Sequence, residues 1–240
     1  MNSYICINGK KTELTSKQVQ ELGFSNIEPV AFGSFSFSEV VNIVRLRKAH
    51  EYFKIGDIIK FEEYKLEIIG FNHDKDISGK RDSTITVMAK TLLPARRMHN
   101  GACGRGWVDS DLRKWLDKEY FHELPEELKS VICTVEKKSE SGSGELFGSQ
   151  DKLFAPSACE MFGADGFHWD GVQYELFRDT SRRLKLDKDR NVCRYWTRSW
   201  APASSEGNSV YALVVGKDGY VRYDYTNDMN IYVPLCFCIA

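Results

Sequence analysis

The sequence predicts an α+β fold in which short antiparallel strands surround a central helical region. Residues 109–132 hold the longest helical pattern, with apolar side chains recurring every three or four positions. Short segments rich in β-branched and aromatic residues lie on both sides of it, among them 57–72 and 209–225. Long polar loops that contain glycine join these segments, and loops of this kind inside a domain tend to carry function.

The composition is that of an ordinary globular protein. The chain has 240 residues, 42% of them hydrophobic and 28% charged, which suits one large domain or two small ones. Its formal net charge of -1 argues against nucleic-acid binding, which normally requires a basic excess. Because no segment approaches the roughly 20 apolar residues of a membrane span, we expect no membrane insertion.

The cysteines indicate a reducing environment. There are seven of them, an odd number, and no CxxC motif occurs. The N-terminal MNSYICINGKKTELT lacks the basic and apolar regions of a secretory signal. We therefore expect synthesis in the cytoplasm, with most thiols reduced and buried. Cys236 and Cys238 share one face of a predicted strand, where packing is preferred over half of a metal site.

The first 52 residues are predicted to form an N-terminal unit for attachment or packing. Asn8-Gly9 lies between two short strands, which is a strong hairpin signal. Thr15 begins a predicted helix that ends at Gly23. Residues 34–53 are predicted to form one or two further short helices. The remaining domain is predicted to span residues 53–240.

In the larger domain, strands are predicted first and helices follow. Residues 83–93 continue the strand pattern that begins at residue 57. Asp109 or Ser110 caps the central helix, and Pro125 begins a second, shorter one. Residues 133–138 are predicted to form a strand and residues 139–150 a mobile loop.

Three further strand segments close the chain. They are residues 192–200, a hairpin over 209–225 that turns at Lys217-Asp218-Gly219, and residues 230–239.

An ordered series of motifs runs through the larger domain. The motifs are IIGFNHD (68–74), GWVDSDLRKWLDKEYFHELPEELKSVICTVEKK (106–138), QDKLFAPSACEMFG (150–163), GVQYELF (171–177), YWTRSW (195–200) and VPLCFCI (233–239). Together they resemble a domain of unknown function that is widespread in proteins of Firmicutes and of their phages and prophages. The resemblance covers about residues 53–240. That family is similar in turn to the C-type-lectin fold used in phage receptor-binding and diversity-generating variable proteins.

The resemblance implies a C-type-lectin-like domain with two central helices, short antiparallel strands and long loops. It also implies that the last strands and their loops, over residues 196–230, bear the ligand contacts. The sequence departs from calcium-dependent lectins, because Thr226-Asn227-Asp228 is only a partial match and both proline tripeptides are missing. Calcium requires six to eight converging oxygens, so we expect no metal and no other cofactor.

Catalytic motifs are not evident. No HExxH zinc motif and no glycine-elbow serine occur. Asn72-His73-Asp74 could supply a general-base dyad, but its side chains are better suited to capping a turn. Related folds include an enzyme that generates formylglycine by oxidising a sulfatase cysteine, yet its motifs are not evident here. We therefore predict no catalytic residues.

The motif YWTRSW leaves two interpretations open. If it is a strand, Trp196, Arg198 and Trp200 share one face. In a core, Arg198 would need a carboxylate partner. At a surface, the guanidinium and indoles would anchor a partner by cation–π contact.

Tyrosines and amides crowd the last hairpin, in a composition like that of antibody paratopes. The alternative is ordinary cross-strand aromatic pairing. The candidate ligand-binding residues are Arg198, Trp200, Asn208, Tyr211, Tyr220, Tyr223, Tyr225, Asn227 and Asp228.

The sequence therefore predicts a non-enzymatic recognition module, associated with a phage or prophage, that binds a protein or cell-surface glycan. Its N-terminal unit would join it to a larger assembly such as a phage tail, which would make it virion-associated. Two alternatives stay open: a structural tail component without a ligand, and an enzyme on a formylglycine-generating-enzyme-like fold.

Overall fold

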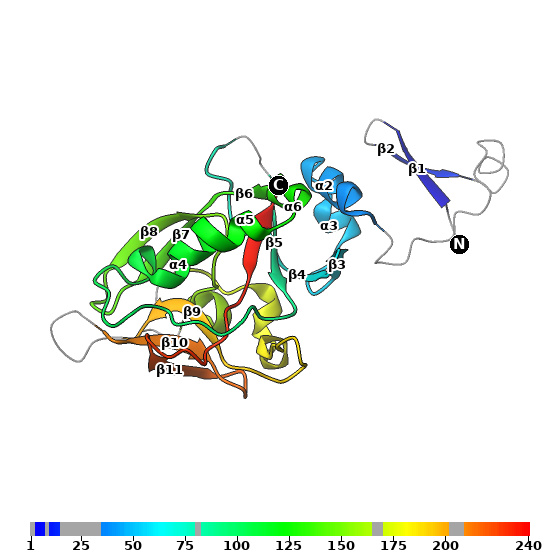
Figure 1. The fold of residues 1–240 in the computed structure, drawn as a ribbon. Coiled ribbons are helices and arrows are strands. Elements are labelled where there is room, and N and C mark those ends of the chain that lie inside the picture. The colour runs from blue at the N-terminus through cyan, green and yellow to red at the C-terminus, as the bar shows by residue number, and fades with distance from the viewer. Residues whose placement is uncertain (1–2, 8–9, 15–34, 80–82, 165–169, 202–208) are drawn as a thin grey trace. The chain divides into compact units, whose positions relative to one another are not determined.

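A computed structural model describes residues 3–7, 10–14, 35–79, 83–164, 170–201 and 209–240 (Figure 1). The chain divides into two compact units, Met1–Ser36 and Phe37–Ala240. The predicted domain boundary after residue 52 therefore differs from the observed division, which lies after Ser36.

The small unit contains the predicted hairpin. Strands β1 (Ser3–Ile7) and β2 (Lys10–Leu14) pair antiparallel, with Ile7 opposite Lys10. This pairing confirms the hairpin expected around Asn8-Gly9. The helix predicted to begin at Thr15 lies outside the described residues.

Two short helices begin the larger unit. Helix α2 (Phe37–Arg45) is amphipathic and buries Phe37, Val40, Val41 and Val44, and α3 (Ala49–Tyr52) follows it. The Phe37 ring lies 4.4 Å from that of Phe61 in β3 (Ile58–Phe61). This packing places residues 37–52 with the larger unit instead of the N-terminal one.

The largest sheet has five strands in the order β3-β4-β5-β12-β6. Every pairing in it is antiparallel, and the last strand of the chain, β12, lies between β5 and β6 (Figure 1). Both faces of β5 and β12 are buried. Besides β3, the strands are β4 (Tyr64–Phe71), β5 (Ile85–Ala89), β6 (Ile132–Cys133) and β12 (Cys236–Ile239).

The central helical region forms where it was predicted. After a 3-10 turn, η1 (Gly106–Asp109), the Ser110 hydroxyl caps the helix by accepting a hydrogen bond from the Arg113 amide. The helical segments that follow are α4 (Asp111–Trp115), the π-helical η2 (Leu116–Tyr120), α5 (Phe121–Glu123) and α6 (Glu126–Lys129). Pro125 directly precedes α6, as expected, and none of the described helices is long and apolar enough to cross a membrane.

The prediction of a mobile loop over residues 139–150 is wrong. Strands β7 (Val135–Glu140) and β8 (Leu146–Asp151) form an antiparallel hairpin across most of it. Serine, glycine and charged residues give this segment little strand propensity of its own. Backbone pairing between the two strands and the burial of Lys137, Ser139 and Ser149 stabilise the hairpin instead.

A three-stranded antiparallel sheet has the order β11-β10-β9. Strand β9 (Tyr195–Trp200) is buried along its whole length, whereas the outer strand β11 (Val221–Tyr225) is largely exposed. Strand β10 (Tyr211–Val215) lies between them. Helix α7 (Ala158–Phe162) and 3-10 turns η3 (Glu175–Arg178) and η4 (Thr180–Arg183) complete an α+β fold, as predicted.

Candidate functional site

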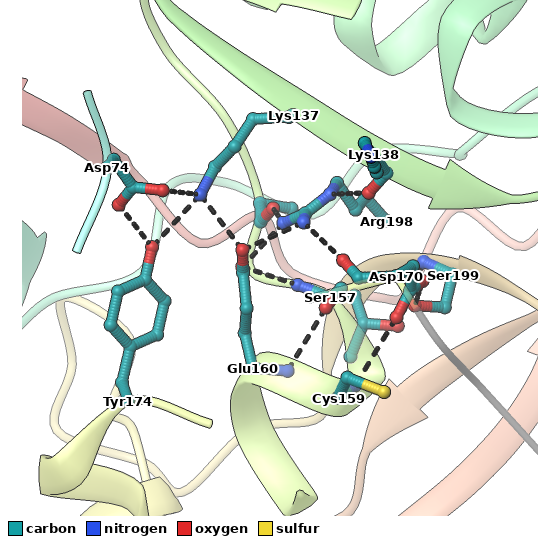
Figure 2. Close-up of polar contacts among 12 residues, drawn as sticks. Asp74, Lys137, Lys138, Ser157, Cys159, Glu160, Asp170, Tyr174, Arg198 and Ser199 are labelled. Atoms are coloured by element: carbon teal, nitrogen blue, oxygen red, sulfur yellow. Dashed lines mark hydrogen bonds and ion pairs between the residues drawn. The ribbon is translucent and has the colours of Figure 1, made fainter. Parts of the chain in front are cut away.

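A buried ion pair joins strand β9 to helix α7. Arg198 of β9 is only 1% exposed, and its guanidinium binds the Glu160 carboxylate with two N–O distances of 2.5 and 2.8 Å. Its remaining N–H groups donate to the backbone carbonyls of Lys138, Ala155 and Asp170 (Figure 2). The carboxylate partner that the core interpretation of YWTRSW requires is therefore Glu160.

A capping box holds Glu160 in place. The Ser157 hydroxyl accepts from the Glu160 amide, and the Glu160 carboxylate accepts from the Ser157 amide, both at 3.0 Å. The backbone of Gly171 passes so close that a Cβ there would lie 2.8 Å from Glu160 Cγ. Nearby, Asp170 accepts from the Ser199 hydroxyl and the Cys159 amide. The N-terminus of α7 and the 170–171 segment thus fix one carboxylate beneath Arg198.

Lys137 extends the ion pair into a network. Its buried ammonium donates to Asp74 at 2.5 Å, Glu160 at 2.9 Å and the Tyr174 hydroxyl at 3.0 Å (Figure 2). Tyr174 donates in turn to Asp74, which also accepts from the Thr86 hydroxyl. Two cations and two carboxylates therefore alternate, and each charge has a charged partner.

The charges shift each other's ionisation. Burial alone would raise the pKa of Glu160, but Arg198 and Lys137 more than offset it and hold that pKa well below its ordinary range. Burial would likewise raise the pKa of Asp74, and Lys137 outweighs burial and lowers it. The pKa values of Lys137 and Arg198 are raised, because their carboxylate partners outweigh the effect of burial. All four groups are therefore charged at neutral pH.

Acidification is expected to destabilise the protein through this network. Glu160 and Asp74 have ordinary pKa values of 4.5 and 3.8, and folding lowers both. The unfolded chain therefore takes up protons first as the pH falls, so the stabilisation is complete above about pH 4.5 and declines below it. Urea unfolding at a series of pH values from 7 to 3 measures this. The variant Glu160→Gln should show a shallower decline, and an equal decline in both proteins would contradict the prediction.

A cleft of about 490 Å³ opens onto the network. The half-buried His73 ring lies at its edge, 4.0 Å from the Tyr174 ring, and burial lowers the pKa of His73, so the imidazole is neutral at neutral pH. As predicted, Asn72 bonds the backbone, accepting from the Thr84 amide. The same prediction is wrong for Asp74, whose carboxylate accepts from the side chains of Lys137 and Tyr174. The cleft is lined by His73, Asp74, Glu136, Lys137, Lys138, Glu160, Asp170, Gly171, Val172 and Arg198.

The network leaves little capacity for chemistry. Lysine has three N–H donors and arginine has five, and those of Lys137 and Arg198 are all engaged by the contacts given above. His73, Asp74 and Glu160 offer ligand atoms within 4.8 Å of one another, a spacing that could suit a metal ion. Lys137 already contacts both carboxylates, however. The arrangement therefore favours a structural ion network over a metal centre.

The second candidate site is an exposed aromatic surface on β10 and β11. Tyr223 is 69% exposed and Tyr225 is 55% exposed. The ring of Tyr211, on the neighbouring strand, lies 4.5 Å from that of Tyr225 and 5.6 Å from that of Tyr223. Val221 of β11 and Met229, which follows that strand in the chain, are also exposed apolar side chains. We call Tyr211, Tyr220, Tyr223, Tyr225, Val221 and Met229 the tyrosine surface.

The free edge of β11 is capped by its own side chains. The odd-numbered residues of this strand direct their backbone groups away from β10. Arg222 donates to the Val221 carbonyl, and the Tyr225 amide donates to Asp224. The Tyr225 carbonyl accepts from the Asp228 amide. Much of the edge is thus unavailable to an added strand, so a partner would bind mainly through side chains.

The structure separates the predicted ligand residues into two groups. Arg198 and Trp200 belong to the core, and Trp200 is completely buried. A Cβ at Gly106 would lie 2.9 Å from the Trp200 ring, which shows how closely η1 covers it. Neither residue contributes to the tyrosine surface, so of the two interpretations of YWTRSW the structure agrees with the core one.

The remaining predicted residues lie on or near the tyrosine surface. Ring contacts join Tyr211 to Tyr223 and Tyr225, and Tyr220 is 56% exposed at the end of the hairpin. Asn227 is exposed and Asp228 is half-buried in the turn after β11. Asn208 lies outside the described residues.

Sequence reasoning missed most of the buried network. Ser157 and Glu160 carry the spacing of a capping box, which could have identified the N-terminus of α7. Lys137 gave no such signal, because charged residues flank it on both sides. Tyr174 likewise has no local pattern that indicates its partner.

Comparisons with known proteins bear on residues 82–240. This segment matches the family model described as "Domain of unknown function (DUF6273)". No curated protein and no solved structure matches the chain. The match covers well over half of the chain and agrees with the resemblance to a domain of unknown function. The chain therefore belongs to the DUF6273 family.

Proposed function

We propose that this protein is a non-enzymatic recognition module that binds a protein or cell-surface glycan through the tyrosine surface. The single observation that carries the proposal is the exposure of Tyr220, Tyr223 and Tyr225 on one hairpin. Buried aromatic rings need no partner, whereas exposed ones on a rigid strand offer large contact area at low entropic cost.

The build of the hairpin supports this role. Strand β10 is buried and anchors β11, and the half-buried Tyr211 supports the two exposed rings beside it. A partner would therefore meet a preorganised surface, which reduces the entropy lost on binding.

The proposal extends to the setting of the protein. We propose a C-type-lectin-like relationship for the larger unit, association with a phage or prophage, and attachment to a larger assembly such as a tail through the N-terminal unit. The motif series and the family membership support a shared domain. The particular assembly is part of the proposal.

An enzyme is the second candidate, and the cleft beside His73 favours it. A neutral imidazole next to carboxylates can act as a general base. Against this role, Lys137 and Arg198 use all their donors within the network, so neither of these two cations is free to stabilise charge that develops on a substrate.

A binding screen tests the proposed function. The full chain would be screened on a glycan array and on bacterial cells, with and without calcium, alongside Tyr220→Ala and Tyr223→Ala. We expect a ligand whose affinity falls about tenfold or more in Tyr223→Ala and is unaffected by calcium. Tyr52→Ala, an exposed tyrosine of α3, is the matched control.

Two outcomes would contradict this proposal. Full affinity in both hairpin variants would place the site elsewhere. A large oligomer that buries the tyrosine surface and binds nothing in the screen would favour the structural tail component.

A further inference from the structure

Lys137 and Asp74 hold the functional groups of an amide bond in contact. The Lys137 side chain is only 1% exposed, and its Nζ lies 2.5 Å from Asp74 Oδ1 (Figure 2). The two residues come from different elements, since Lys137 belongs to β7 and Asp74 follows the end of β4. An amine held this close to a carboxyl group reacts as an intramolecular partner and not as a dilute reagent.

Proton transfer within this pair produces the two groups that condense. Attack requires a neutral amine and a neutral carboxylic acid. Among the described residues, Lys137 is the one cation that Asp74 contacts, so a proton that passes from Nζ to Oδ1 leaves both groups uncharged. Both side chains are buried, which favours neutral forms. The charged pair given above is the major form, and the neutral pair is the minor form that reacts.

Glu160 is placed to move the remaining proton. Its Oε1 lies 2.9 Å from the Lys137 Nζ, and one of its oxygens is within 4.8 Å of an Asp74 oxygen. Arg198 binds both oxygens of Glu160 and keeps it ionised, so Glu160 is not itself the acid that is attacked. Attack makes the protons on Nζ acidic, and Glu160 can accept one and pass it to the oxygen that leaves Asp74.

The other oxygen of Asp74 is held by hydroxyl groups. Asp74 Oδ2 accepts from Tyr174 at 2.7 Å and from Thr86 at 2.8 Å. Attack on Cγ places negative charge on this oxygen, and donors aimed at it stabilise that charge. The centroid of the Phe154 ring lies 4.0 Å from the Lys137 Nζ, so an apolar group helps to exclude water from the amine.

A second buried lysine–carboxylate pair lacks these features. Lys185 Nζ lies 2.6 Å from Glu67 Oε2, and both side chains are 1% exposed. Glu67 also binds Lys90 and Arg182, so a proton from Lys185 would arrive beside two further cations. Among the described residues, Lys185 contacts no second carboxylate that could carry a proton away. A short buried contact alone is therefore not enough, and this pair should stay unreacted.

We propose that Lys137 and Asp74 condense in the folded protein to an amide that joins two side chains 63 residues apart. Lys137 Nζ attacks Asp74 Cγ, the N–C bond forms, and the Cγ–Oδ1 bond breaks. Both protons that the ammonium loses end on Oδ1, which leaves as water, so no oxidant or cofactor is consumed. The ion network given above is the state that precedes this reaction. The bond does not depend on the tyrosine surface or on its ligand.

Intact mass spectrometry and peptide mapping of the full chain test this bond. We expect the chain, incubated in the folded state, to lose about 18 Da, the mass of one water. Trypsin should then release segments 66–75 and 130–138 as one branched peptide that is uncleaved after Lys137. Asp74→Asn should give a product of the same mass, because loss of ammonia from the asparagine leaves an identical bond. Lys137→Arg keeps the charge but lacks the amine, and should retain its full mass.

The unsubstituted chain decides the outcome even if a variant fails to fold, which circular dichroism would show. Full mass after prolonged incubation of the folded chain, with segments 66–75 and 130–138 recovered separately, overturns the bond. A branched peptide that joins Lys137 to Glu160, or Lys185 to Glu67, in place of the expected one overturns the assignment of the reacting pair.

Discussion

Glutamine in place of Glu160 is expected to lower the free energy of unfolding by about 3–5 kcal/mol. The substitution keeps the size of the side chain but removes the charge that Arg198 and Lys137 share. Both cations are then buried, with Asp74 the one network carboxylate left to Lys137. Urea unfolding at pH 7, followed by circular dichroism, measures the change.

A matched control separates the effect of burial on stability from the effect of changing glutamate to glutamine. Glu127 is exposed on α6, and Glu127→Gln should change the free energy of unfolding by less than about 0.5 kcal/mol. Adding Lys137→Met to Glu160→Gln should be less destabilising than the sum of the two single changes, because the two groups interact directly. A loss below about 1 kcal/mol for Glu160→Gln would contradict the structural role of the network.

Removing the indole of Trp200 is expected to have a similarly large effect on stability. This side chain is completely buried at the end of β9 and lies against η1. Trp200→Ala should lower the free energy of unfolding by about 3–5 kcal/mol, because the surrounding chain can fill only part of the cavity. Chemical unfolding monitored by circular dichroism measures this.

The same experiment separates the two interpretations of YWTRSW. Tyr220→Ala removes an exposed ring and should leave stability within about 0.5 kcal/mol of the unsubstituted protein. If Trp200→Ala were equally mild, the tryptophan would not belong to the core.

Local patterns predicted the elements that local chemistry determines. The Asn8-Gly9 hairpin, the Ser110 cap and the 209–225 hairpin each depend on residues close together in the chain, and the structure contains their strands and helix. The exposed tyrosines were also predictable, since a polar hairpin at the edge of a sheet has few neighbours to bury its rings.

The buried network could not be predicted, because its members are distant in sequence. Lys137 and Asp74 are 63 residues apart, and Arg198 and Glu160 are 38 apart. The alternation of side chains along a strand placed Arg198 and Trp200 on one face of β9. Every residue of β9 is buried, however, so this alternation could not distinguish a core face from a surface face. The β7–β8 hairpin was not predicted for a related reason. Burial in the folded protein outweighs the weak strand propensity of its residues.

The position of β12 has a consequence for biosynthesis. The central place in the five-stranded sheet, between β5 and β6, is filled by residues 236–239. During translation, β5 and β6 lack the neighbour that joins them until those residues leave the ribosome. The nascent chain must keep two incomplete strand edges from pairing with other polypeptides, and we expect chaperones that shield such edges to increase the yield of native protein.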